Sequence, residues 1–138
     1  MLNDSDPSFG AASQPKRMPS IFLVDDEVPL VKLFSRILTR EGYTVDSTTD
    51  SRAALDIVKA NPEKYDVLIS DYRMPGLMGD VLIEEVRKSG FVGKVIIFSG
   101  HVPENRESWR QAMGADAVAE KACTTALLEA LKQITSGE

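Results

Sequence analysis

The strongest constraint on the fold is an alternation of short apolar runs with longer segments of helical periodicity, repeated five times along the chain. The apolar runs, which are expected to form strands, cover residues 21–24, 43–45, 65–70, 94–98 and 117–119. The segments after them space apolar side chains three and four positions apart, as amphipathic helices do, and they cover 29–41, 51–60, 79–88, 103–113 and 124–134. This alternation predicts a parallel sheet with helices on both faces.

The individual runs limit how the strands can be arranged. Residues 21–24 are apolar without interruption, as expected of a strand covered on both faces. The second run is polar by comparison, with Thr44, Asp46 and Ser47, which is typical of a sheet edge. Because crossovers between parallel strands are right-handed, these features favour the strand order 2-1-3-4-5. We therefore predict an α/β chain folded as a flavodoxin-like three-layer sandwich, with a five-stranded parallel sheet and five helices.

Two local expectations concern the last helical segments. Thr124 or Thr125 is expected to cap the final helix, because a hydroxyl oxygen accepts well from the first free backbone N–H groups. In the preceding segment, the spacing of Trp109, Ala112 and Met113 predicts that these three side chains form the inner face.

Composition and charge narrow the classes of function. With 138 residues, the chain has the size of one ordinary domain; we expect a flexible leader over residues 1–18, where periodicity is lacking, and a single domain over 19–138. The net charge of −5 disfavours direct nucleic-acid binding, which needs a basic face. Cys123 is the single cysteine, so no intrachain disulfide forms and a cytoplasmic location is expected. No apolar run approaches the ~18 residues of a membrane span, so no membrane association is expected.

Asp71 follows the third apolar run and precedes a loop that contains Pro75 and Gly76. Taken alone, such an aspartate either starts a turn or is a reactive group held at the rim of a sheet. The ends of the other predicted strands favour the second interpretation.

Charged and polar residues gather at those strand ends. Asp25 and Asp26 follow the first run, Asp71 the third, Ser99 the fourth and Lys121 the fifth. Since strands 1 and 3 are neighbours in the predicted order, three carboxylates converge at one edge of the sheet. Hard oxygen ligands with room for water and phosphate oxygens suit Mg²⁺, while Lys121 adds a positive charge and Ser99 a hydroxyl donor. Together these groups are typical of a phosphoryl-transfer site with a carboxylate nucleophile.

The motifs at these strand ends resemble those of response-regulator receiver domains of two-component signalling, the family of the chemotaxis protein CheY. The resemblance extends from about Ser20 to Ile134. The matching pieces are Leu23-Val24-Asp25-Asp26-Glu27, Ile69-Ser70-Asp71-Tyr72-Arg73-Met74-Pro75-Gly76, Phe98-Ser99-Gly100, and Gly114-Ala115-Asp116 running to Lys121.

The resemblance implies a role for each matching residue. Asp71 corresponds to the phosphoacceptor, and Asp25 and Asp26 correspond to the acidic pair that, with Asp71 and the backbone carbonyl of Arg73, binds Mg²⁺ or Mn²⁺. Ser99 corresponds to the hydroxyl residue that turns toward the phosphoryl group.

The resemblance also covers the surroundings of the phosphoryl group. Lys121 corresponds to the lysine that pairs with the phosphoryl group. Side chains at the positions of Arg73 and His101 flank the group in this family and influence its lifetime. For His101, an exposed loop histidine is the alternative interpretation.

The implied function is that of a signalling phosphoacceptor, not of an enzyme with a separate substrate. A histidine kinase or histidine phosphotransfer protein would donate the phosphoryl group. Phosphorylation would then alter the face formed by the fourth helix, fifth strand and fifth helix. This face would contact an output domain, an output protein or a second copy in a homodimer. Slow self-catalysed dephosphorylation would reset the domain. The chain would be either a stand-alone receiver or a piece of a multidomain regulator or hybrid histidine kinase.

Two positions depart from the family pattern. The family usually has Lys-Pro after the fifth strand, often with a cis bond, whereas this chain has Lys121-Ala122. A cis bond before alanine costs about 3 kcal/mol or more, so trans and strained cis forms are both considered. Val118 stands where the family has its switch aromatic, so signal transmission is expected to rely on the loop after the fourth strand.

Three alternative functions fit the sequence less well. A Mg²⁺-dependent phosphohydrolase would need an Asp-x-Asp motif. Here the residue two positions after Asp71 is Arg73, and the residue two positions after Asp25 is Glu27. A flavin-binding protein of the same fold would need a Ser/Thr/Gly-rich loop where Asp25, Asp26 and Glu27 stand. A receiver-like module that has lost phosphorylation would lack some of the core residues, all of which are present.

Overall fold

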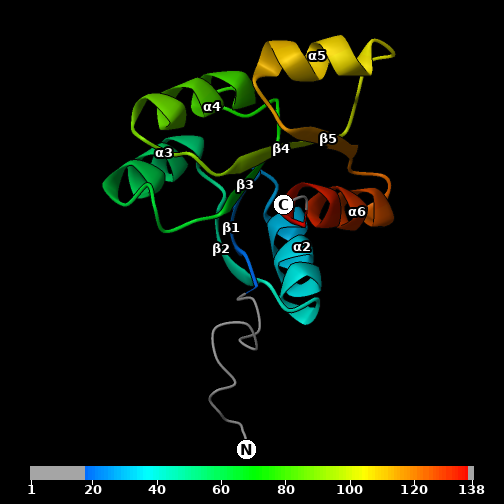
Figure 1. The fold of residues 1–138 in the computed structure, drawn as a ribbon, viewed down its shortest axis with the longest axis horizontal. Coiled ribbons are helices and arrows are strands. Elements are labelled where there is room, and N and C mark those ends of the chain that lie inside the picture. The colour runs from blue at the N-terminus through cyan, green and yellow to red at the C-terminus, as the bar shows by residue number, and fades with distance from the viewer. Residues whose placement is uncertain (1–17, 137–138) are drawn as a thin grey trace, which may run out of the picture.

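The computed structural model describes residues 18–136, in which five strands alternate with five helices (Figure 1). The strands are β1 (Ser20–Val24), β2 (Thr44–Thr48), β3 (Val67–Ser70), β4 (Lys94–Ser99) and β5 (Ala117–Glu120). The helices are α2 (Val28–Arg40), α3 (Ser51–Ala60), α4 (Gly79–Lys88), α5 (Arg106–Met113) and α6 (Thr124–Thr135). Apart from Met18, the leader expected over residues 1–18 lies outside this part of the chain. None of the helices between residues 18 and 136 has the length and apolar character that a bilayer crossing requires.

The strands form one parallel sheet in the order β2-β1-β3-β4-β5, which confirms the predicted order. β1 lies between β2 and β3, so that Val24 is aligned with Thr48 on one side and Ser70 on the other. Every residue of β1 and β3 is buried, whereas every residue of the edge strand β2 is at least partly exposed. The polarity of the second strand therefore reflects its place at the edge.

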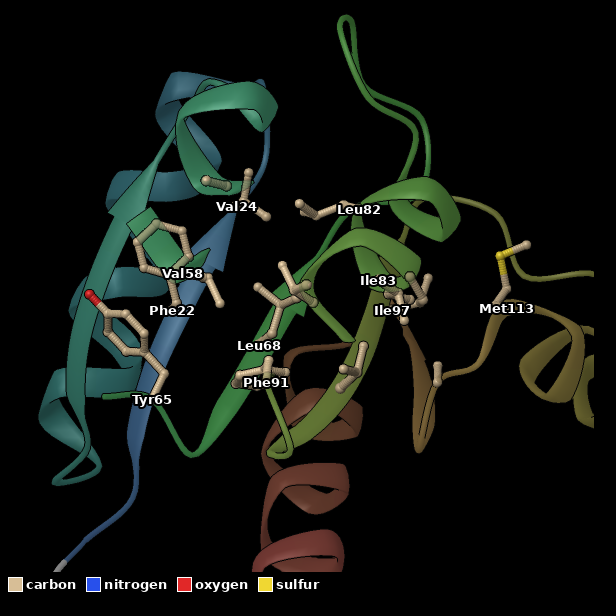
Figure 2. Close-up of a cluster of buried hydrophobic side chains, with 14 of the residues drawn as sticks. Phe22, Val24, Val58, Tyr65, Leu68, Leu82, Ile83, Phe91, Ile97 and Met113 are labelled. Atoms are coloured by element: carbon tan, nitrogen blue, oxygen red, sulfur yellow. The ribbon is translucent and has the colours of Figure 1, made fainter. Parts of the chain in front are cut away.

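Helices α2 and α6 cover one face of the sheet, and α3, α4 and α5 cover the other (Figure 1). Successive strand residues point to opposite faces, so Phe22 and Val24 join the core beneath α3 and α4. Figure 2 shows these two side chains on the same side of the sheet as Leu68 of β3 and Leu82 and Ile83 of α4. Burying each side chain of this size contributes about 1.5–3 kcal/mol, so both cores hold the strand ends in fixed register.

The second core packs the alternate residues of the same strands against α2 and α6. Ile21 and Leu23 of β1 contribute from the sheet, Phe34 from α2 and Leu127 from α6. The rings of Phe34 and Phe98 meet edge to face, with their centroids 4.8 Å apart. With both faces covered, polar groups can gather only at the ends of the strands.

Three local predictions are wrong. The fourth helix begins at Arg106 and not at residue 103, because residues 100–105 form a loop after β4. Ala112 is exposed, because the short helix α5 buries only a narrow stripe. Cys123, whose backbone is still extended, is the N-terminal flanking residue of α6 and is exposed. Thr124 and Thr125 consequently lie inside the helix and cap nothing.

Candidate functional site

The carboxyl ends of β1 and β3 bring two aspartates side by side. The backbone N–H of Asp71 donates to the carbonyl of Val24 at 3.0 Å, which extends the ladder between these strands by one residue. Asp25 directly follows Val24, so its side chain leaves the sheet beside that of Asp71. Both aspartates are nearly inaccessible to solvent, with 3% of Asp25 and 7% of Asp71 exposed.

Asp26 completes a cluster of three carboxylates. One oxygen from each of Asp25, Asp26 and Asp71 lies within 4.8 Å of the other two. Asp26 is exposed, so the cluster opens toward solvent on its side. Three converging oxygen ligands with open positions fit a Mg²⁺ or Mn²⁺ ion, which retains several waters when it binds protein.

Lys121 lies between the two buried aspartates. Its Nζ is 2.6 Å from Oδ2 of Asp25 and 2.9 Å from Oδ2 of Asp71, and 13% of its side chain is exposed. The Lys121–Ala122 bond is trans, since no peptide bond in the described residues is cis. The ammonium group therefore reaches the aspartates without the cis bond that the family often has at this place.

Burial and charge shift the pKa values of this cluster in definite directions. Burial, helped by the charge of Asp25, raises the pKa of Asp71, and the hydrogen bonds from Lys121 and from the backbone N–H of Tyr72 only partly oppose it. Burial alone would lower the pKa of Lys121, but hydrogen bonds and charges from both aspartates raise it overall. The positive charge of Lys121 therefore only partly offsets the burial of Asp71 and its repulsion from Asp25.

The loop after Asp71 is held at both ends. The backbone N–H of Tyr72 donates to Oδ1 of Asp71 at 2.7 Å, and that of Gly79 donates to the carbonyl of Tyr72 at 2.7 Å. A Cβ atom on Gly79 would lie 2.5 Å from the carbonyl oxygen of Asp71, so only glycine permits this close approach. The start of α4 therefore packs directly against the backbone of the candidate phosphoacceptor.

A serine on α3 braces the middle of the same loop. The hydroxyl of Ser51, which is 2% exposed, donates to the carbonyl of Pro75 at 2.7 Å and accepts from the N–H of Leu77 at 2.8 Å. The sequence carries no signal for this role, because Ser51 precedes the loop by more than twenty positions and reads only as a helix start. Together with Gly79, Ser51 sets the path of the backbone around Arg73.

Ser99 ends β4 with its hydroxyl engaged locally. Its Oγ donates to the carbonyl of His101 at 3.0 Å and accepts from the N–H of His101 at 3.3 Å. The backbone N–H of Lys121 donates to the carbonyl of Ser99 at 2.9 Å, which ties the two strand ends together. The Ser99 side chain must therefore leave His101 before it can donate to a group on Asp71.

These residues surround an open cavity of about 700 Å³. Six predicted site residues line it, namely Asp26, Asp71, Arg73, Ser99, His101 and Lys121, while Asp25 lies beneath Lys121. Both Arg73 and His101 are exposed. Tyr72, Pro103 and Trp109 also line the cavity, and sequence reasoning assigned them no part in the site.

Comparison with known proteins gives one consistent result. The family model described as "Response regulator receiver domain" matches residues 21–132. Response regulator ArlR of Staphylococcus epidermidis is 40% identical over 62 residues, which cover 45% of this chain and 27% of ArlR. Transcriptional regulatory protein TcrA of Mycobacterium tuberculosis is 39% identical over 59 residues, covering 43% of this chain and 22% of TcrA. The matched segment thus spans about a quarter of these relatives.

Solved structures match nearly the whole described fold. A response regulator receiver domain protein from Clostridium thermocellum superposes with a TM-score of 0.77 at 27% identity, covering 86% of this chain and 95% of that one. Response regulator protein TrrA from Thermotoga maritima, solved in complex with Mg(2+)-BeF, superposes with a TM-score of 0.73 at 29% identity, covering 85% and 99%. Chemotaxis protein CheY4 of Vibrio cholerae gives 0.75 at 25% identity, covering 85% and 98%.

Proposed function

This chain belongs to the response regulator receiver domain family, and we propose that Asp71 accepts a phosphoryl group from a phosphorylated histidine of a kinase or phosphotransfer protein. The observation that carries this proposal is the convergence of Asp25, Asp26, Asp71 and Lys121 at one end of the sheet. Asp71 is the aspartate in this group that lines the cavity, contacts Lys121 and is nearly buried. It is therefore the carboxylate most completely surrounded by groups that bind phosphate.

The metal site consists of the carboxylates of Asp25, Asp26 and Asp71 and the backbone carbonyl of Arg73. The oxygen-only donor set and the spacing within 4.8 Å fit Mg²⁺ or Mn²⁺. When bound, such an ion offsets the negative charge that accumulates where phosphate meets carboxylate. Ser51 and Gly79 hold the loop that carries Arg73, whose backbone carbonyl would complete the ligand set.

Asp71, Lys121 and Ser99 have separate roles in phosphoryl transfer. An oxygen of Asp71 attacks phosphorus while the bond to the histidine nitrogen breaks, and positioning and charge stabilisation supply most of the catalysis. Lys121 exchanges its hydrogen bond to Asp71 for one to a phosphoryl oxygen and keeps its bond to Asp25. The Ser99 hydroxyl rotates away from the backbone of His101 and donates to another phosphoryl oxygen.

This rotation offers a route to the output face, which comprises α5, β5 and α6. Ser99 is joined to His101 through two hydrogen bonds and to Lys121 through the backbone, so its movement shifts the loop before α5. Val118 is buried in place of a mobile aromatic ring, and Arg106 of α5 donates to its carbonyl at 2.7 Å. Helix α5 and strand β5 therefore respond together, and their shared face contacts an output domain, an output protein or a second copy of the chain.

Hydrolysis of the acyl phosphate resets the domain. The side chains of Arg73 and His101 line the mouth of the cavity, where they limit the approach of water to phosphorus. The rate of this self-catalysed step sets the lifetime of the signal.

Intact-protein mass spectrometry tests the proposal. Incubation with acetyl phosphate and Mg²⁺ adds one phosphoryl group to the wild type and to Asp56→Asn, a control on the exposed side of α3. Asp71→Asn gains none, because the same charge change removes the nucleophile. A phosphoryl group on Asp71→Asn, or none on the wild type, would refute the proposal.

The metal site is tested separately by thermal denaturation. Mg²⁺ raises the melting temperature of the wild type and of Asp56→Asn, because an ion that binds only the folded state stabilises it. In Asp26→Asn the response is smaller, since a ligand is lost. If Mg²⁺ raised the melting temperatures of Asp26→Asn and Asp56→Asn equally, Asp26 would not be a ligand and the metal site would be wrongly assigned.

A further inference from the structure

The cavity around Asp71 is larger and less polar than a phosphoryl group requires. Its volume of about 700 Å³ falls in the range of sites that hold organic ligands, roughly 300–1,000 Å³. The lining combines charged groups, among them Asp26, Asp71 and Lys121, with an apolar wall of Tyr72, Pro103 and Trp109. The wall thus lines the same cavity as the candidate phosphoacceptor.

The aromatic part of this wall is fixed relative to the nucleophile. The rings of Tyr72 and Trp109 meet edge to face, with their centroids 5.5 Å apart and their planes at 80°. Both side chains are partly buried and pack against the core beneath α4 and α5. The backbone N–H of Tyr72 donates to Oδ1 of Asp71 at 2.7 Å. The carboxylate of Asp71 and the residue that carries the Tyr72 ring are therefore directly connected.

We propose that Trp109, supported by Tyr72, determines specificity for the leaving group of the phosphoryl donor by contacting the imidazole ring of phosphohistidine during transfer. This inference rests on the proposed function of Asp71. In an in-line displacement the leaving group lies on the far side of phosphorus from the attacking oxygen, so it occupies the cavity in front of Asp71. Tyr72 and Trp109 line this same cavity, where a planar ring can contact them.

The chemistry of the leaving group matches this wall. The oxygen of Asp71 forms a bond to phosphorus as the phosphorus–nitrogen bond breaks, and the electron pair of that bond returns to the imidazole nitrogen. The ring is protonated at its other nitrogen before transfer, so it leaves as neutral imidazole and no further proton is needed. A protonated planar ring is attracted to the face of a tryptophan both by ring contact and by its charge, and neither acetate nor ammonia offers such a ring.

The test compares two small donors on the same protein, in the presence of Mg²⁺. Phosphoimidazole releases imidazole and phosphoramidate releases ammonia, so the ratio of their phosphorylation rates isolates the contribution of the ring and cancels any loss of active protein. Trp109→Leu keeps an apolar side chain but no ring, and Trp109→Phe restores a ring. Leu33→Ala is the control, because Leu33 is an exposed apolar residue of α2 that does not line the cavity.

In Trp109→Leu, the phosphoimidazole-to-phosphoramidate ratio falls by about three- to tenfold, the range expected for one lost aromatic contact. Trp109→Phe recovers most of the ratio, and Leu33→Ala keeps that of the wild type. An unchanged ratio in Trp109→Leu overturns the assignment while phosphorylation of Asp71 still stands. If neither donor phosphorylates the wild type, the proposed function fails and this inference fails with it.

Discussion

Replacing Lys121 by methionine removes the ammonium group that lies between two buried carboxylates. The ammonium group lies 2.6 Å from Asp25 and 2.9 Å from Asp71, whose side chains are 5% and 9% exposed. Methionine has a similar length and fills the same space, so packing is largely kept and charge is the main change. The variant therefore leaves both carboxylates close together without a compensating cation.

The size of the effect follows from burial. Two unit charges 2.6 Å apart attract each other by roughly 6 kcal/mol at an effective dielectric constant of about 20, and the cost of desolvating lysine cancels part of this. Removing one partner of a buried ion pair typically costs about 3–5 kcal/mol. Since 13% of the Lys121 side chain is exposed, we expect the free energy of unfolding at neutral pH to fall by about 3 kcal/mol.

Urea unfolding at neutral pH, with Lys88→Met as the control, measures this difference. Lys88 pairs with Glu84 at 3.6 Å on the surface of α4, where 65% of its side chain is exposed, and such pairs contribute about 0.3–0.5 kcal/mol. Adding Mg²⁺ narrows the deficit of Lys121→Met, because a metal ion among the aspartates replaces part of the lost charge. A loss no larger than that of Lys88→Met would refute the electrostatic account of this cluster.

Further predictions concern a partly buried hydrogen bond and a close backbone contact. Tyr65 donates to Asp46 at 2.6 Å, which lowers the pKa of this carboxyl group. A lowered folded-state pKa stabilises the fold above the unfolded pKa of about 3.9 and less as the pH falls. Tyr65→Phe should therefore cost about 1 kcal/mol at neutral pH and less below about pH 4; a deficit independent of pH in urea unfolding would argue against this pair. Gly79→Ala places a Cβ 2.5 Å from the backbone oxygen of Asp71 and should cost about 1–3 kcal/mol and weaken Mg²⁺ binding by calorimetry. Gly100→Ala, with open space around its Cβ, is the control, and equal losses in both would contradict the steric argument.

The sequence contained enough information to predict the sheet and most of the strand ends. A strand that is covered on both faces needs apolar residues throughout, as in 21–24. The edge strand β2 is partly exposed and tolerates polar residues. Once the order is known, Asp25 and Asp71 must emerge side by side, since neighbouring parallel strands end at the same edge. This part of the site follows from local composition and topology alone.

Other features depend on where loops run in space, which local patterns do not specify. The brace from Ser51 to the loop after Asp71 joins distant segments through a single hydroxyl. The hydrogen bond from the Ser99 hydroxyl to the backbone of His101 depends on the path of the loop after β4, which the position of Ser99 at a strand end does not specify. Ala112 has the spacing of an inward residue but is exposed, because helical periodicity does not reveal how much of a short helix the sheet covers.

The role of Asp71 as phosphoacceptor is tested most directly by locating the phosphoryl group. The protein is phosphorylated with phosphoramidate and Mg²⁺ and then reduced with borohydride, which converts an aspartyl phosphate to homoserine, and its peptides are sequenced by mass spectrometry. We expect homoserine at the position of Asp71 and unmodified Asp25 and Asp26. Homoserine at either of those two positions, or in no peptide, would contradict it.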